Sequence, residues 1–360
     1  MQAMRTVALL LMLASALADE PSSWQELTPE VDRSVSKATE WLLSAQRRSG
    51  AWGLDRTGQD PDDVSCTSIA ALALMAGGNT ERGGPDGRAV EAVQRAAMFV
   101  LARARAARDG AGDMMLGGQQ SLIQTKLGYN IHTFFATTFL SQALGMQYLT
   151  TEQEEEVRHL LRRMTDRIAK TQEADGSWHR NTFGSLKATC MAWLALRSSS
   201  SAGIQVDGAS MEKTVKFIRS QYVAATRLFG AEGGGYQTIY ATASSVRVLH
   251  GVGEGKDDKI VSARKAFFAY VRDGGQMGGQ FLSVEGEDYL AAAMMTQALS
   301  QQGGDEWREW FTWIRKRLID KQGGDGSWTG TACISGRTFA TSCALLTLQA
   351  PNRLLPLQDL

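Results

Sequence analysis

The chain has 360 residues, of which 43% are hydrophobic, and its 38 basic side chains equal its 38 acidic ones. This composition supplies a sizeable packed core and excludes a disordered chain. A net charge of zero, without a basic stripe, argues against nucleic acid or an anionic membrane as a partner, because both need clustered Lys and Arg.

The first eighteen residues predict a cleavable signal peptide. Arg5 precedes an apolar stretch at 7–13, and Ala16-Leu17-Ala18 stands directly before Asp19, which is the order of a charged region, an apolar region and a small-residue cleavage site. The apolar stretch is too short to span a bilayer, and no later segment is long and apolar enough to do so. We therefore expect export to a secreted or periplasmic location, with residues 1–18 removed and 19–27 forming a short leader.

A spaced motif, Gln-x-x-x-Gly-x-Trp, occurs in three well-kept copies. They run from Gln46 to Trp52, from Gln172 to Trp178 and from Gln322 to Trp328. Two weaker copies are expected, one with Gly279 and Phe281 in the Gly and Trp positions, the other marked by Gly234, Gly235 and Tyr236. Motifs that return at a fixed period indicate a repeat architecture.

A second pattern marks each repeat with a Thr, or once an Ala, seven residues before a Leu. The six markers are Thr67, Thr137, Thr189, Thr242, Ala292 and Thr341. They return about every fifty residues, apart from a longer first step that holds an insertion at 103–119, rich in Arg, Ala and Gly.

Each repeat predicts two helices of different character. The first is amphipathic, as at 31–45; Thr28 is its expected N-cap with Pro29 in the first turn, and Thr151 with Glu154 predicts a capping box for a later one. The second is apolar almost all round, as at 68–75 and 188–196, and such a helix must be buried on every side. Six outer and six inner helices over 28–350 therefore predict an all-α fold, a closed two-layer α/α toroid, followed by a tail at 351–360.

The Gln-x-x-x-Gly-x-Trp copies resemble the QW motif of squalene and terpene cyclases, which share one repeat superfamily with the β-subunits of protein prenyltransferases. The resemblance implies a six-fold α/α toroid whose cavity opens where the inner helices begin. It also implies that the motif residues are structural and tie outer helices together: Gln46, Trp52, Gln172, Trp178, Gln322 and Trp328.

An acidic string at 60–63 matches the Asp-x-Asp-Asp motif with which class II cyclases protonate their substrate. A buried carboxyl beside other carboxylates can act as an acid, which makes Asp62 and Asp63 candidates. In the cyclases the last Asp directly precedes the repeat Thr, whereas here Cys66 holds that place. Four residues before the markers stand Asp63, Thr133, Ser185, Thr238, Asp288 and Arg337. Five of these six are N-cap residue types, so helix capping is the favoured role of Asp63 and Asp288.

The zinc site of the prenyltransferases is not expected. The resemblance places a ligand Cys at Cys66, but Val64 stands where the partner Asp would be. Thiolate, carboxylate and imidazole must converge on zinc, so we predict neither a metal nor another cofactor.

Polar residues at the starts of the inner helices are expected to surround the mouth of the ring. The catalytic candidates are Asp62, Asp63, His132, Glu287 and Asp288, and the binding candidates are Tyr240, Arg337 and Cys66. In a closed ring Arg337 falls between the two acidic pairs, where a rim salt bridge is its favoured role and a part in a polar mouth the alternative. Closure would also bring Cys66 toward Cys333, and a disulfide between them is a further hypothesis.

The favoured function is an exported repeat protein that binds an apolar or isoprenoid molecule, or a protein partner, in its cavity without a standard cyclase or zinc centre. One alternative is a terpenoid cyclase-type enzyme with Asp62 or Asp63 as general acid. A second is an enzyme acting on polysaccharide, consistent with export. The sequence leaves open whether the protein is an enzyme.

Overall fold

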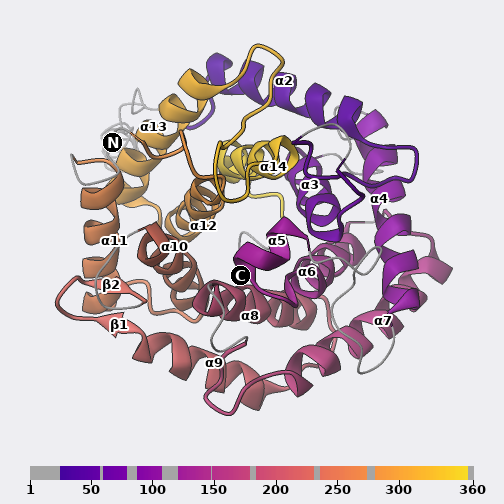
Figure 1. Ribbon diagram of the computed structural model, residues 1–360, viewed down its shortest axis with the longest axis horizontal. Coiled ribbons are helices and arrows are strands. Elements are labelled where there is room, and N and C mark those ends of the chain that lie inside the picture. Colours follow the sequence, from indigo (N-terminus) through magenta and orange to yellow (C-terminus); the bar gives the residue numbers. More distant parts are fainter. Residues whose placement is uncertain are drawn as a thin grey trace, which may run out of the picture.

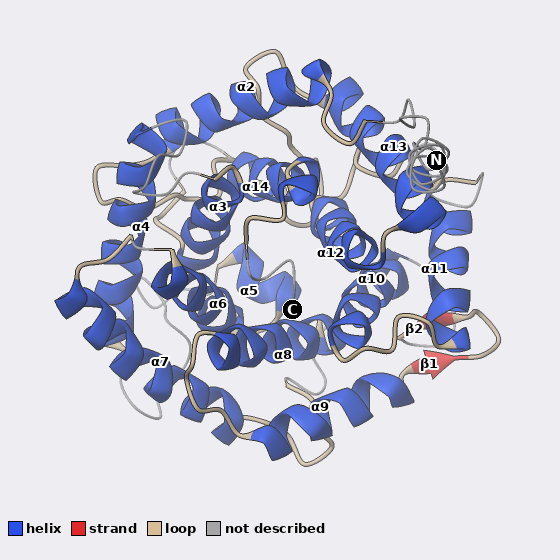
Figure 2. Ribbon diagram, turned by 180° about the vertical axis from the view of Figure 1, so that it is seen from behind, coloured by secondary structure: helices blue, strands red, loops and turns tan. Residues whose placement is uncertain are grey.

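The computed structural model describes residues 25–56, 60–78, 87–107, 121–146, 148–178, 184–230, 236–273 and 280–355. The predicted signal peptide, most of the insertion at 103–119, and Gly234, Gly235 and Gly279 lie outside these residues. The described helices form two concentric rings around one central axis (Figures 1 and 2).

Outer and inner helices alternate along the chain. The outer ring holds α2 (Pro29–Ala45), α4 (Gly87–Ala106), α7 (Thr151–Lys170), α9 (Gly208–Ser220), α11 (Asp258–Val271) and α13 (Gly304–Lys321). The inner ring holds α3 (Val64–Ala76), α6 (Ile131–Gly145), α8 (Ser185–Ser201), α10 (Tyr236–Gly251), α12 (Glu287–Gln302) and α14 (Arg337–Leu348). Three smaller elements complete the described chain: α5 (Leu122–Leu127), the hairpin of β1 (Tyr222–Val223) with β2 (Leu228–Phe229), and a 3₁₀ turn η1 (Ala350–Asn352).

The distribution of apolar residues explains the two layers. Every residue of α3 is buried, because this inner helix is packed between its ring neighbours and the outer layer. By contrast, α7 buries one stripe, Val157, Leu160, Leu161, Met164, Thr165 and Ile168, at the spacing of one helix face. The predicted all-α toroid is confirmed. No helix among the described residues is both long enough and apolar enough for a membrane span.

The ring is closed by contacts between its first and last units, with α2 beside α13 and α3 beside α14 (Figure 1). At this seam the Gln322 side-chain amide donates to the carbonyls of Ser34 and Gly326, both at 2.9 Å. Gln172 makes the equivalent bonds between α7 and α9, to Ser210 O at 2.9 Å and Gly176 O at 3.1 Å. A motif Gln thus links each such outer helix to the next one.

The marker Thr connects each inner helix to the loop before it. The hydroxyls of Thr67, Thr189 and Thr341 accept the backbone N–H of Trp52, Trp178 and Trp328, each at 3.0 Å. In the fourth unit Thr242 accepts from Phe229 N at 2.9 Å. Phe229 therefore takes the Trp position there, and Tyr236, which marked this copy in the sequence, does not, because it already begins α10.

The helix caps differ in part from expectation. Thr28 caps α2 as predicted, by accepting from Val31 N. The capping box of α7 is shifted by one residue and consists of Thr150 and Gln153 instead of Thr151 and Glu154.

Of the six residues that stand four places before the markers, Asp63 alone is an N-cap in the described residues, accepting from Cys66 N at 2.8 Å. The other helices begin earlier than predicted, so Thr133, Ser185, Thr238, Asp288 and Arg337 lie inside them.

Candidate functional site

One end of the inner ring gathers buried polar side chains. Each inner helix follows an outer helix, so all six begin at the same end of the ring. The short helix α5 lies across this end, near the centre of the ring (Figure 1), in contact with α6 and α8. We call this end, where the inner helices begin, the mouth.

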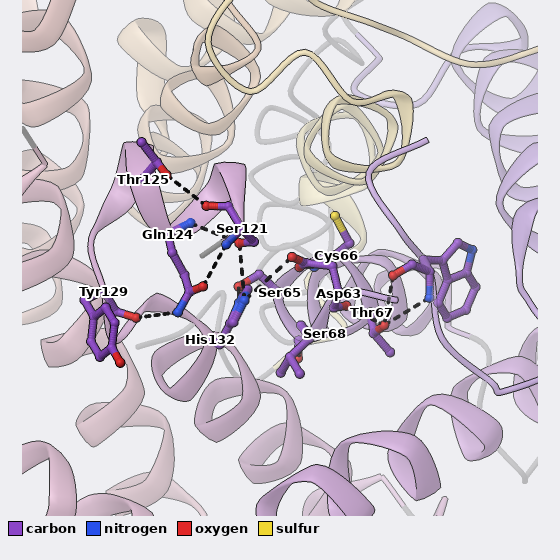
Figure 3. Close-up of polar contacts among 12 residues, drawn as sticks. Asp63, Ser65, Cys66, Thr67, Ser68, Ser121, Gln124, Thr125, Tyr129 and His132 are labelled. Atoms are coloured by element: carbon purple, nitrogen blue, oxygen red, sulfur yellow. Dashed lines mark hydrogen bonds and ion pairs between the residues drawn. The ribbon is translucent and has the colours of Figure 1, made fainter. Parts of the chain in front are cut away.

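His132, in the first turn of α6, is the centre of a first polar cluster at the mouth (Figure 3). Its Nδ1 lies 2.6 Å from Ser65 Oγ of α3, and its Nε2 lies 3.3 Å from Ser121 Oγ, the N-cap of α5. Asp63 Oδ2 is 3.7 Å from the same Nε2. The buried imidazole of α6 therefore joins the start of α5 to the start of α3, whose Ser65 lies 67 residues before His132.

Serine, histidine and aspartate together have the composition of a nucleophile, a base and an orienting acid. The geometry does not complete such a triad, because 3.7 Å between His132 Nε2 and Asp63 Oδ2 exceeds a hydrogen bond. Ser65 is also fully buried. We therefore assign this cluster to holding α5 against α3 and α6.

A second cluster at the mouth joins α8, α10 and α12. The Lys187 ammonium donates to Glu287 Oε2 at 2.9 Å and to Gln237 Oε1 at 2.8 Å, and it lies 5.5 Å from the centre of the Tyr240 ring. Lys187 and Glu287 are 2% and 1% exposed. Burial lowers the pKa of Lys187, and the charge of Glu287 opposes that shift. Because desolvating an ion pair is unfavourable and seldom adds net stability, this buried pair is a candidate functional site.

Asp288, the next residue on α12, is held from both sides. Tyr240 OH donates to its Oδ1 and Leu282 N to its Oδ2, both at 2.8 Å. Burial raises the pKa of Asp288 to about 7, although these two hydrogen bonds lower it. The prediction that Asp288 caps an inner helix is wrong. It is the second residue of α12 and instead fixes the loop before it, where Leu282 has a φ of 64°.

Apolar side chains continue the same helix faces below the polar clusters. On each of three inner helices, a polar mouth residue is followed by two apolar residues that line the central axis. These sets are Ser65 with Ile69 and Leu72 on α3, Lys187 with Met191 and Leu194 on α8, and Glu287 with Leu290 and Met294 on α12. Spacings of three, four and seven residues place each set on one helix face. The space between these side chains is about 30 Å³.

Two mouth candidates form ion pairs instead of facing these clusters. Asp62 lies 2.8 Å from Arg47. Arg337 pairs with Asp55 at 2.7 Å and Asp325 at 2.9 Å, and its guanidinium lies 5.2 Å from the centre of the Trp41 ring. Arg337, the first residue of α14, therefore forms the rim salt bridges that were its favoured prediction, and α14 lies between α12 and α3 in the ring.

The proposed disulfide is also wrong: among the described residues, Cys66, Cys190, Cys333 and Cys343 are all free. Cys66 is buried within α3, and burial raises the pKa of its thiol. Cys333 lies in the loop before α14, where burial and a hydrogen bond with Glu285 raise the pKa of its thiol to about 11.

Sequence reasoning missed Lys187, Gln237, Ser65 and Ser121. Lys187 had a usable signal, since it stands two residues before the marker Thr189 in an otherwise apolar helix start. Ser121 had none, because α5 follows an insertion that the repeat does not contain. No three His, Cys, Asp or Glu side chains of the described chain converge as a metal ion would require.

Comparison with known proteins defines the class of fold. No family model matches the sequence, and no curated protein matches it. The type II terpene cyclase MstE from Scytonema has a similar structure, with a TM-score of 0.54 and 13% identity over 91% of this chain and 100% of that chain. The GH76A α-1,6-mannanase from Salegentibacter sp. HEL1_6 has a TM-score of 0.61 and 11% identity, over 90% of this chain and 99% of that chain. The chain therefore has the α/α-toroid fold, as its resemblance to the terpene cyclases implied, and at these identities the likeness concerns the fold alone.

Proposed function

We propose that the ring binds an amphiphilic small molecule, with an apolar, isoprenoid-like chain along the axis and a polar end at Lys187 and Glu287. The observation that carries this proposal is the change from polar to apolar residues along single helix faces. On α8 the order is Lys187, Met191, Leu194, and on α12 it is Glu287, Leu290, Met294. A few convergent polar groups over an apolar lining are typical of small-molecule sites.

Apolar side chains fill most of the ring's axis. A space of about 30 Å³ is roughly a tenth of the smallest typical ligand pockets, and α5 lies across the mouth. Binding therefore requires α5 to move and apolar side chains to rotate. Met191 and Met294 suit this role, because methionine is unbranched and adapts its shape.

Two further points support the proposal. A variant of the neighbour MstE has been solved in complex with geranylgeranyl dihydroxybenzoate, its substrate, which joins an isoprenoid chain to a polar ring. The predicted signal peptide would place the ring in a secreted or periplasmic compartment. A protein partner in the cavity is a less favoured reading, because the mouth polar groups are buried.

The test is binding of geranylgeraniol to the mature protein, followed by native mass spectrometry and by the intrinsic fluorescence of tryptophan. Met294→Phe, which fills the axis, should weaken binding at least roughly tenfold, the effect of about 1.4 kcal/mol. Met98→Phe, on the outer helix α4 at a residue that is 38% exposed, is the matched control and should bind as the wild type does.

Absence of binding, or equal weakening by both variants, would contradict the proposal. Binding of α-1,6-mannotriose in place of geranylgeraniol would favour the polysaccharide alternative.

Asp62 and Asp63 as general acids stay a prediction. The same protein incubated with squalene or geranylgeranyl diphosphate, beside Asp62→Asn and Asp63→Asn, tests it through product formation. Unchanged substrate throughout would exclude cyclisation of these two substrates.

A further inference from the structure

One carboxylate oxygen of Glu287 has no hydrogen-bond donor in the cluster formed by Lys187, Gln237 and Tyr240. Oε2 accepts from Lys187, whereas Oε1 is buried and has no hydrogen-bond partner in the described part of the chain. The carboxyl group is 1% exposed, so bulk water does not solvate it. A buried acceptor without a donor is unfavourable, and this one lies on the helix face that leads into the apolar axis.

The neighbouring loop adds a second such oxygen. The Oε2 atom of Glu285 is buried and also lacks a partner within the described residues. The loop before α14 is fastened to this region, since Thr331 N and Ala332 N donate to Val284 O at 2.8 and 2.9 Å. The mouth therefore has two buried acceptor oxygens that could each receive a hydrogen bond from a donor group of a ligand.

The charged groups at the mouth also favour a donor over an anionic group of a ligand. The charges of two further carboxyl groups, Glu285 and Glu287, act on Asp288 and raise its pKa. Lys187 is already engaged by Glu287, and Lys126 of α5 acts on Lys187 and Cys333. A diphosphate brought here would meet acidic groups, and like charges at a few ångströms repel strongly where little water screens them.

We infer that the polar end of the ligand is a hydrogen-bond donor, a hydroxyl or an ammonium group received by Glu287 Oε1, and not a phosphate. This inference rests on the proposed function and specifies its ligand class. The head group of a ligand can be changed while its chain stays the same. The inference about the head group can therefore fail while the proposed binding of the chain holds.

The experiment compares four compounds that share one chain: geranylgeraniol, geranylgeranylamine, geranylgeranyl methyl ether and geranylgeranyl diphosphate. The alcohol and the amine should bind the wild-type protein at least roughly tenfold more tightly than the ether and the diphosphate, as expected when a buried acceptor gains or lacks its donor. Glu287→Gln should remove most of the amine's advantage over the ether. Glu30→Gln, the same change on an exposed residue of α2, should leave the order of affinities unchanged.

Each outcome is decisive. Binding of the ether or the diphosphate as tightly as the alcohol overturns the inference and leaves the proposed function standing. Failure of all four compounds to bind overturns the proposed function itself. Since Glu287→Gln leaves Lys187 without its anionic partner, thermal unfolding of the variant is recorded first. If it does not fold, the comparison of the four compounds on the wild-type protein is still sufficient.

Discussion

Asp63 shows how the position of a single carboxyl sets its role. It accepts the N–H of Cys66 at 2.8 Å and so satisfies one of the free donors at the start of α3. Asp63→Ala should lower the free energy of unfolding by roughly 0.5–2 kcal/mol, the usual effect of losing an N-cap. Asp62→Ala removes a part-exposed ion pair and should change it by about 0–1 kcal/mol. Urea denaturation of both variants checks this, and an unchanged midpoint for Asp63→Ala would refute the capping role.

Asp288 and His250 should shift stability in opposite directions over the same pH range. Burial raises the pKa of Asp288 from 3.8 to about 7, so the folded protein binds a proton that the unfolded chain releases, and stability falls as pH rises between these values. Burial and the charge of Arg264 lower the pKa of His250 from 6.5 to about 4, so the stability it contributes is lost as pH falls through this range.

Thermal unfolding from pH 4 to 7 separates the two groups. Asp288→Asn should leave a profile in which stability increases with pH up to about 6.5, and His250→Gln one in which it decreases toward pH 7. The wild-type profile should lie between them. Parallel profiles for all three proteins would mean that neither group titrates as described.

At the scale of elements, Gly286 lies where the loops before α12 and α14 approach each other closely. A Cβ added at this residue would lie 1.7 Å from Ile334 O, which is shorter than any non-bonded contact, so Gly286→Ala should separate the loops before α12 and α14. We expect a loss of roughly 1–3 kcal/mol in stability, the usual range for overpacking. Gly324→Ala, where a Cβ would meet nothing within 4 Å, is the control. Equal melting temperatures for the two variants would contradict the close approach.

The sequence predicts some elements well for identifiable physical reasons. The inner helices are apolar on all sides, which forces burial on all sides, and the marker Thr supplies a register that places His132, Tyr240 and Glu287 at the helix starts. Exact starts were less predictable, because Asp288 has a cap-forming side chain that instead accepts hydrogen bonds from Tyr240 OH and Leu282 N.

The partners of the site residues depend on contacts that no local spacing encodes. Ser65 and His132 are 67 residues apart, and Lys187 and Glu287 are 100 residues apart. The position of α5 follows from its fit to α6 and α8, so Ser121 could not be assigned to His132 from the sequence.

At the scale of the whole molecule, Gln322 and Gln172 make equivalent bonds in different settings. A continuous chain through α8 joins the two helices that Gln172 links, whereas no peptide segment leads directly from α13 to α2. Gln322→Ala should therefore raise amide hydrogen exchange in α2 more than Gln172→Ala raises it in α9. Both should lower global stability by about 1–3 kcal/mol through the acceptors left unpaired. Equal exchange in α2 and α9 would show that the seam is no weaker than the other joints.

Closure of the ring changes how the protein can come apart. A linear array of repeats has two end units, each with one neighbour, and it can fray from them. Here α2 and α3 contact α13 and α14, so each unit has a neighbour on both sides and no unit is a free end. Removing any one unit requires two interfaces to break at once. We therefore expect a single cooperative unfolding transition, and a circular permutant that joins the chain across the seam and opens it elsewhere should retain that cooperativity.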